Sequence, residues 1–104
     1  IHFDVDQAVI KPESQPVVGQ IAVLLKDNPQ LAVSIEGHTD NTGAADHNKA
    51  LSRQRAEAVV AALVTQGIDA KRMSAVGWGQ EKPVADNRSD AGRAKNRRVE
   101  IVKK

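Results

Sequence analysis

One arginine interrupts the apolar side of a helix that the sequence predicts over Asp46–Gln66. On a helical wheel, at about 100° per residue, Leu51, Val59 and Leu63 fall in one apolar arc, which also contains Ala62. Arg55 lies inside this arc, four residues after Leu51 and four before Val59. Because an unpaired charge is costly to bury, Arg55 needs either a partner or a route to water.

The segment before this helix supplies a candidate partner. It reads Gly-His-Thr-Asp-Asn-Thr-Gly over residues 37–43 and is dense in turn formers. Since the segment leads into the helix, we expect Asp40 to lie close to Arg55. Two interpretations stay open. An Asp40–Arg55 salt bridge would staple the loop to the helix. Alternatively, the pair faces a ligand and grips a free amino-acid head group, with the carboxylate taking the ammonium and the guanidinium taking the carboxylate.

Enzyme and metal chemistry find less support in the sequence. His38, Asp40 and His47 are possible metal ligands, but the His-x-Asp spacing is weak evidence and no second histidine pair at helical spacing completes a site. We expect His38 to hydrogen-bond within the turn instead. Ser52 and Ser74 lack a base with an orienting group nearby. We therefore predict a binding module rather than an enzyme, with no metal and no cofactor.

Aromatic residues are nearly absent, which narrows the ligand classes. Phe3 and Trp78 are the only two, and there is no tyrosine. Trp78 could stack on a sugar ring, but packing beside a strand is the favoured interpretation, and Gly77-Trp78-Gly79 alone is no nucleotide fingerprint. Basic residues concentrate near the end of the chain, and the formal net charge is +2. Without interleaved aromatics this indicates a solvated basic edge rather than a nucleic-acid site.

Length and composition indicate one compact domain over residues 1–104, with 40% hydrophobic and 27% charged residues. There is no cysteine, which excludes disulfides and thiolate chemistry. No window approaches the apolar length of about 20 residues that spans a bilayer. The chain opens on Ile1 in a strand-like pattern, without a signal peptide. We expect it to be cut from a longer precursor, with any export signal or membrane anchor upstream.

Hydrophobic periodicity predicts four strands and three helices in the order β-α-β-α-β-(short α)-β. We expect an α+β, two-layer fold with a mixed four-stranded sheet and both long helices on one face, because the strands alternate between apolar and polar residues. The predicted strands are Ile1–Val5, Leu31–Glu36, Arg72–Trp78 and Arg98–Val102, and the predicted helices run from Pro12 to about Lys26, over Asp46–Gln66 and over Ser89–Lys95.

Several motifs occur in an order and at a spacing that resemble the OmpA-like domain family, which includes peptidoglycan-associated lipoproteins and flagellar stator proteins. The resemblance covers essentially the whole chain. The residues that carry it are Phe3-Asp4, Pro12, Ile35 to Gly43, Asn48, Leu51, Ser52, Arg55, Ala56, Val59, Leu63, Gly77, Gly79, Pro83, Asn87, Gly92-Arg93-Ala94 and Asn96 to Glu100.

The resemblance implies a function and a set of site residues. Members of the family bind peptidoglycan non-covalently through the free amino-acid end of meso-diaminopimelate in the stem peptide. The resemblance makes Asp40 and Arg55 the two recognition residues, and the turn near Asp6 closes the pocket. Of the neighbouring Arg97 and Arg98, the resemblance makes one structural and places one at the site edge, and the sequence does not decide which. The predicted ligand-binding residues are Asp40, Arg55, Thr39, Asn41, Asp6 and Arg98.

The same resemblance predicts the setting. We expect a periplasmic module that anchors the outer membrane or an envelope protein of a Gram-negative bacterium to the cell wall. The partner is peptidoglycan, without nucleic acid, and contact with a membrane comes only through segments outside this chain. A second possibility is an envelope protein–protein interaction module, including a homodimer, that does not bind the wall directly.

Overall fold

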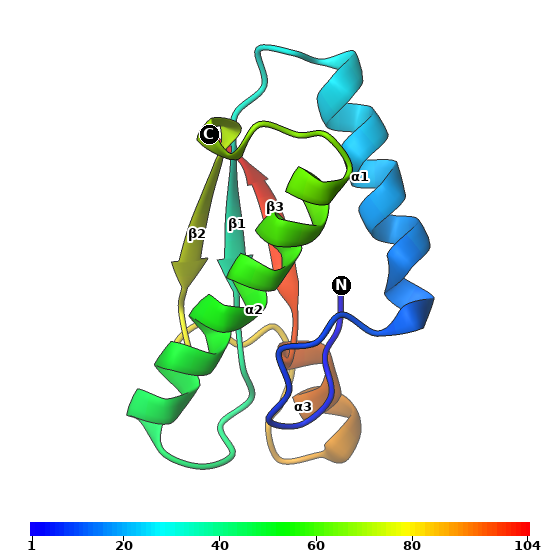
Figure 1. Cartoon of the computed structure of the whole chain (residues 1–104). Coiled ribbons are helices and arrows are strands. Elements are labelled where there is room, and N and C mark those ends of the chain that lie inside the picture. The colour runs from blue at the N-terminus through cyan, green and yellow to red at the C-terminus, as the bar shows by residue number, and fades with distance from the viewer.

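The computed structural model describes residues 1–104 and contains two long helices, one short helix and three strands (Figure 1). Each observed element overlaps one that the sequence predicts, although the predicted start of the first helix is a 3-10 turn. No helix combines the length and the apolar character that are needed to cross a membrane. In chain order the elements are the 3-10 turn Pro12–Ser14, α1 Gln15–Asp27, β1 Val33–Gly37, α2 Ala45–Thr65, the 3-10 turn Ala70–Arg72, β2 Met73–Gly77, α3 Asp90–Asn96 and β3 Val99–Lys103.

The sheet is mixed, with strand order β2-β1-β3. β1 runs parallel to β2, placing Gly37 opposite Gly77, and antiparallel to β3, placing Ile35 opposite Ile101. The parallel pair needs a crossover connection, and α2 provides it. Alternate residues of β1 are buried, and the residues between them are half-buried. The expectation of a mixed sheet with one covered face is thereby confirmed.

The predicted strand Ile1–Val5 is wrong, so the sheet has three strands rather than four. Next to β3 the segment makes a single bridge, between His2 and Arg98. It then turns, with the Gln7 N–H donating to the Asp4 carbonyl at 3.2 Å. The ladder would continue with the Arg97 N–H donating to the Phe3 carbonyl, but that N–H donates to the Arg93 carbonyl at 3.2 Å and the Phe3 carbonyl accepts the Arg97 side chain instead. Alternation in the sequence could not reveal this competition.

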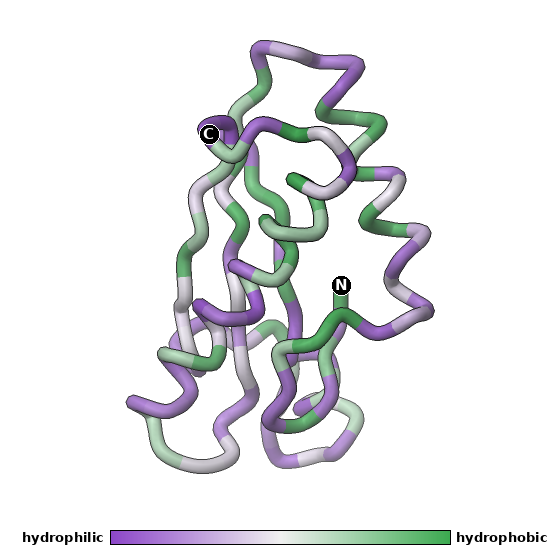
Figure 2. The backbone as a smooth tube through the Cα atoms, in the orientation of Figure 1, coloured by the Kyte–Doolittle hydropathy of each residue, from purple (hydrophilic) through white to green (hydrophobic).

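Both long helices and the covered face of the sheet share one hydrophobic core. Figure 2 shows hydrophobic residues recurring along the strands and along both helices. In the sequence of α1, Val17, Ile21, Leu24 and Leu25 repeat at helical spacing, but the helix is apolar on more than one side and a different, overlapping stripe is buried. Val17 and Leu24 are exposed, whereas Val18, Ala22 and Leu25 are buried. The core contains Phe3, Val18, Ala22, Leu25, Val33, Ile35, Ala56, Val59, Leu63, Ile68, Met73 and Val99.

Two opposed glycines let α2 lie close to the sheet. A Cβ atom on Gly37 would come within 1.9 Å of the Ser52 carbonyl oxygen, and one on Gly77 within 2.7 Å of the Ser52 hydroxyl. That hydroxyl accepts the Gly79 N–H at 2.8 Å. The close approach fixes the first half of α2 against the ends of β1 and β2. It thereby sets the position of the polar loop that joins β1 to α2.

The long polar segment between β2 and α3 is held by one amide side chain. Asn96 is fully buried, and its oxygen accepts the backbone N–H groups of Val84 and Ala85 at 2.7 and 3.1 Å. Its nitrogen donates to the Ala85 carbonyl and to the side-chain oxygen of Asn87. The predicted short helix is present, and its Ser89 cap accepts the Gly92 N–H at 2.9 Å.

Candidate functional site

A cavity of about 270 Å³ lies where β1 ends. Three parts of the chain enclose it: the N-terminal turn, the loop from β1 into α2 with the first half of that helix, and Arg97, which lies two residues before β3. Its lining is mostly polar, and Val5 and Leu51 are the two hydrophobic members. The lining residues are Val5, Asp6, Thr39, Asp40, Thr42, Gly43, His47, Asn48, Leu51, Arg55 and Arg97.

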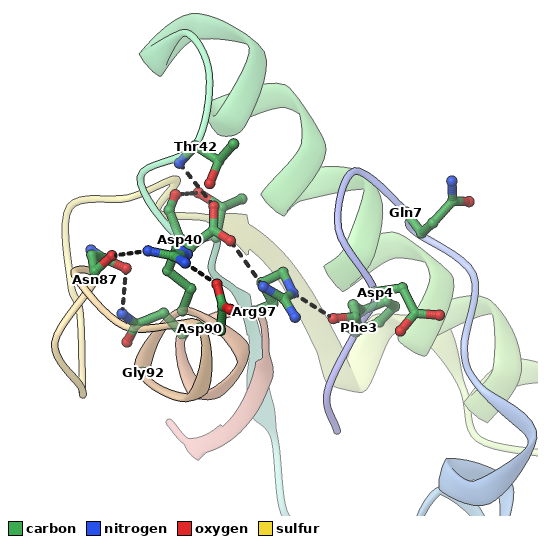
Figure 3. A network of polar contacts seen from close by, with 12 residues as sticks. Phe3, Asp4, Gln7, Asp40, Thr42, Asn87, Asp90, Gly92 and Arg97 are labelled. Carbon is green, nitrogen blue, oxygen red and sulfur yellow. Dashed lines mark hydrogen bonds and ion pairs between the residues drawn. The ribbon is translucent and has the colours of Figure 1, made fainter.

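Asp40 is the buried carboxylate of the cavity, with 4% of its surface exposed. One of its oxygens accepts the Thr42 N–H at 2.9 Å, and the other accepts the Arg97 guanidinium at 3.0 Å. Figure 3 shows Arg97 between Asp40 and the carbonyl of Phe3, to which it also donates at 3.0 Å. Burial opposes ionisation, but these hydrogen bonds outweigh it and hold the pKa of Asp40 below its usual value. The carboxylate is therefore ionised at neutral pH.

Arg55 lies at the cavity floor and exposes none of its surface. It donates to three backbone carbonyls, those of Gln7 at 2.7 Å, His38 at 2.9 Å and Asp4 at 2.9 Å. Its guanidinium carbon also lies 5.3 Å from the centroid of the Phe3 ring, a cation–π contact. Burial, and then the Arg97 charge, lower the pKa of Arg55 to about 10, so it stays cationic at neutral pH. A guanidinium has five N–H groups, and these bonds leave two for another acceptor.

The expectation that Asp40 and Arg55 lie close is met in one respect, because both line the same cavity. They form no salt bridge, since Asp40 pairs with Arg97 instead. The staple interpretation is therefore wrong about its partner, although Arg55 does tie α2 to the N-terminal turn through backbone carbonyls. An arginine fits this position because a single side chain can reach several carbonyls at once.

The structure distinguishes the two neighbouring arginines, whose roles the sequence left open, although Arg98 was the one included among the predicted site residues. Arg97 lines the cavity, whereas Arg98 lies outside it. Arg98 donates to Glu100 at 2.6 Å and to the carbonyls of Asn96 and Lys82 at 3.2 and 3.0 Å. These bonds hold the segment between β2 and α3 against β3. Arg98 is thus the structural member of the pair in this fold.

The rim of the cavity combines predicted and unpredicted residues. Thr39 and Asp6 line it as expected, whereas Asn41 is exposed and is not among the lining residues. Asp6 has φ 55°, a left-handed conformation that aspartate tolerates better than most residues. One oxygen of its carboxylate lies 2.5 Å from Nε2 of His47 of α2, across the mouth. The lining residues that sequence reasoning missed are Val5, Thr42, Gly43, His47, Asn48, Leu51 and Arg97.

His38 does not form the predicted hydrogen bond within the turn. Its side chain is 2% exposed, and neither ring nitrogen has a hydrogen-bond partner. The nearest carboxylate, Glu100, lies 4.0 Å from Nε2. Burial, followed by the charge of Arg98, lowers the pKa of His38. A neutral imidazole is therefore enclosed directly behind the cavity loop.

Trp78 packs at the rim of the sheet, as favoured from the sequence. The residue is half-buried, and its indole N–H donates to Glu36 at 2.8 Å. The Lys82 ammonium lies 3.6 Å from the centroid of its ring.

Nowhere in the molecule do three His, Cys, Asp or Glu side chains come together in a way that could hold a metal ion.

Comparison with known proteins identifies the family to which this fold belongs. The model of the OmpA family matches residues 2–97. The chain belongs to the OmpA family. Among curated relatives of this OmpA domain, "Probable lipoprotein YiaD" of Escherichia coli is 45% identical over 102 residues, which are 98% of this chain and 47% of the relative. "Peptidoglycan-binding protein ArfA" of Mycobacterium tuberculosis is 43% identical over 98% of this chain and 31% of the relative.

The chain thus spans less than half the length of these curated relatives. Among solved structures, the peptidoglycan-associated lipoprotein from Burkholderia pseudomallei superposes with a TM-score of 0.96 at 39% identity, over 100% of this chain and 88% of that one. The cell wall anchor of the T6SS from Pseudomonas aeruginosa superposes with a TM-score of 0.81 at 38% identity, over 96% and 72%. The OmpA fold of this chain is therefore common to proteins described as wall-associated.

Proposed function

We propose that this OmpA domain binds peptidoglycan non-covalently, by gripping the free amino-acid end of meso-diaminopimelate in the stem peptide. The single observation that carries the proposal is the cavity in which an ionised carboxylate, Asp40, lies among two arginines, Arg55 and Arg97. A zwitterionic head group needs such an arrangement, because its ammonium seeks a carboxylate and its carboxylate seeks guanidinium N–H groups.

Each charged residue of the cavity has a role in this proposal. The ligand's ammonium binds Asp40, whose oxygens can accept further hydrogen bonds beyond those from Thr42 and Arg97. The ligand's carboxylate binds Arg97, whose side chain is 15% exposed. Arg55 completes the grip from the floor through its two remaining N–H groups. Because Arg55 is fully buried in this structure, that contact requires the turn at Asp4 and Gln7 above it to shift.

The relatives support the wall as the target, since their names describe a peptidoglycan-binding protein, a peptidoglycan-associated lipoprotein and a cell wall anchor. The domain would then act in the periplasm and attach the rest of its protein, or the outer membrane, to the cell wall. Nothing in this role requires a covalent step, because charge-assisted hydrogen bonds provide the recognition.

Co-sedimentation with purified sacculi tests the proposal. Asp40→Asn removes the charge while leaving an oxygen for the Thr42 N–H, so wall binding should be lost. Asp27→Asn is the matched control, because Asp27 is an exposed carboxylate at the end of α1, away from the cavity. A soluble release of wall fragments would indicate an enzyme. A parent protein that stays in the supernatant would indicate a protein–protein adaptor instead.

A ligand-side experiment is independent of any effect on folding. Amidating the free carboxylate of the diaminopimelate centre removes a negative charge and places a donor against the arginines. Loss of a charged hydrogen bond typically costs about 1.5–3 kcal/mol, or roughly 10- to 150-fold in affinity. Calorimetric titration of the parent protein should show this difference. Equal affinity for the two peptides would contradict the head-group model.

A further inference from the structure

An exposed ion pair spans the mouth of the cavity, and the proposed grip does not use it. Asp6 belongs to the N-terminal turn and His47 to the first turns of α2, 41 residues apart in sequence. Both side chains line the cavity, and they are 64% and 58% exposed. Water and solutes therefore reach the pair directly.

The turn that carries Asp6 is held in place from both sides. Arg55 donates to the carbonyl of Asp4 before it and to the carbonyl of Gln7 after it. The Gln7 N–H also donates back to the Asp4 carbonyl at 3.2 Å. The positive φ of Asp6 lies at the tip of this clamped turn. In this structure the turn thus presents the carboxylate at the mouth, in contact with His47.

The charges that line the cavity balance only when His47 is neutral. Asp6 and Asp40 contribute two negative charges, and Arg55 and Arg97 contribute two positive charges. Asp46 adjoins His47 on α2, and Lys11 is paired with Asp4 and Glu13 rather than with this cluster. A protonated His47 leaves the lining with one excess positive charge. Histidine is the side chain that changes its charge between about pH 5 and 8.

We propose that protonated His47 competes with the ligand's ammonium group for Asp6, so that stem peptides bind this cavity more weakly as the pH falls. The inference rests on the proposed function, because it requires a ligand that brings an ammonium group to the cavity. Asp6 is then a second acceptor for that ammonium beside Asp40, and His47 is a specificity-determining residue. Because the ligand's ammonium and a protonated His47 compete for the same carboxylate, peptide binding and protonation of His47 oppose each other, which links affinity to pH.

Titration calorimetry with a synthetic stem peptide ending in meso-diaminopimelate tests the inference. The parent should bind about two- to fivefold more weakly near pH 5.5 than near pH 7.5, the scale set by one exposed ion pair. His47→Gln, which is neutral throughout this range, should remove most of that difference, and Asp6→Asn should reduce it. His2→Gln is the control, because His2 lies outside the cavity, and it should keep the parental profile.

The possible results separate the two proposals. The same pH dependence in His47→Gln as in the parent, or tighter binding at the lower pH, overturns the competition. Absence of peptide binding at every pH overturns the proposed function, and this inference with it. Binding that weakens in the parent but not in His47→Gln supports both.

Discussion

The two ends of the molecule are stabilised by different interactions. Around Leu63 and Val18 the core is made of aliphatic side chains from both helices and the sheet. The end that holds the cavity buries many polar or charged residues, and Asp40, Arg55 and Asn96 are satisfied by specific hydrogen bonds, whereas the His38 ring has no hydrogen-bond partner. Aliphatic packing depends on volume and tolerates similar shapes, whereas a polar network depends on the identity of each donor and acceptor.

The largest effect should come from the aliphatic end. Leu63 is fully buried in α2, so Leu63→Ala should lower the free energy of unfolding by about 2–5 kcal/mol through lost burial and the cavity left behind. Chemical denaturation measures this. A loss below about 0.5 kcal/mol, as for a surface site, would show that this end does not depend on tight packing.

Two glycines test the boundary between the ends. Gly37→Ala should destabilise by about 3 kcal/mol, the upper part of the range for overpacking, because the new Cβ meets backbone of α2. Gly19→Ala is the matched control, since nothing lies within 4 Å of its Cβ position in α1. There alanine should stabilise by about 0.5–1 kcal/mol. Thermal melts of both variants should move in opposite directions, and equal shifts would contradict the close approach.

Arg55 tests the polar end. If Arg55 only faced a ligand, Arg55→Ala would leave folding nearly intact, but its hydrogen bonds to backbone carbonyls lead us to expect a loss of stability. Removal of Arg55 strands the His38 carbonyl in a buried place and frees the N-terminal turn. We expect a loss of about 2 kcal/mol, within the cost of unsatisfied buried groups. Arg53→Ala, an exposed position on the same helix, should change the stability by less than about 0.5 kcal/mol. Matching denaturation curves for the two variants would contradict this role.

The smallest effect should be a pH dependence from His38. Its pKa in the folded protein is lowered by burial, so the unfolded chain binds the proton first as the pH falls. Stability is therefore fully present above the unfolded value of about 6.5 and is lost as the pH falls through the folded pKa. His38→Gln should flatten this part of the stability profile. His2 also has a lowered pKa, again through burial first, so His2→Gln is measured beside it. An unchanged profile in His38→Gln would contradict the assignment.

Most of the fold was predictable because helix α2 and three strands have clear periodicity. Leu51, Val59 and Leu63 fell in the arc that is buried, and Arg55 lay within it. The prediction of a first strand was wrong for a physical reason. Its alternation is genuine at Phe3, which is buried, but the Phe3 carbonyl accepts an arginine side chain and the chain turns after Asp4, so Val5 is 55% exposed.

The cavity was only partly predictable, although one signal could have found more of it. Side chains along a strand point alternately to its two faces. If the alternation of the last strand is extended backwards, Arg97 falls on the same face as Val99 and Ile101, which is the covered one, and Arg98 on the same face as Glu100. Applied one residue further back, alternation would have placed Arg97 toward the helices and Arg98 away from them. The Asp6–His47 pair carried no such signal, because it depends on a turn that pattern cannot predict.

The attachment of the N-terminal segment through side chains has a mechanical consequence. A pull on Ile1 against a molecule held at Asp40 would travel from the Phe3 carbonyl through the Arg97 guanidinium to the carboxylate. That route crosses two hydrogen bonds and bypasses the aliphatic core. Tension on the domain would therefore load the proposed recognition residues, together with the backbone hydrogen bonds that join Ile1 and Phe3 to Val99 and Arg97.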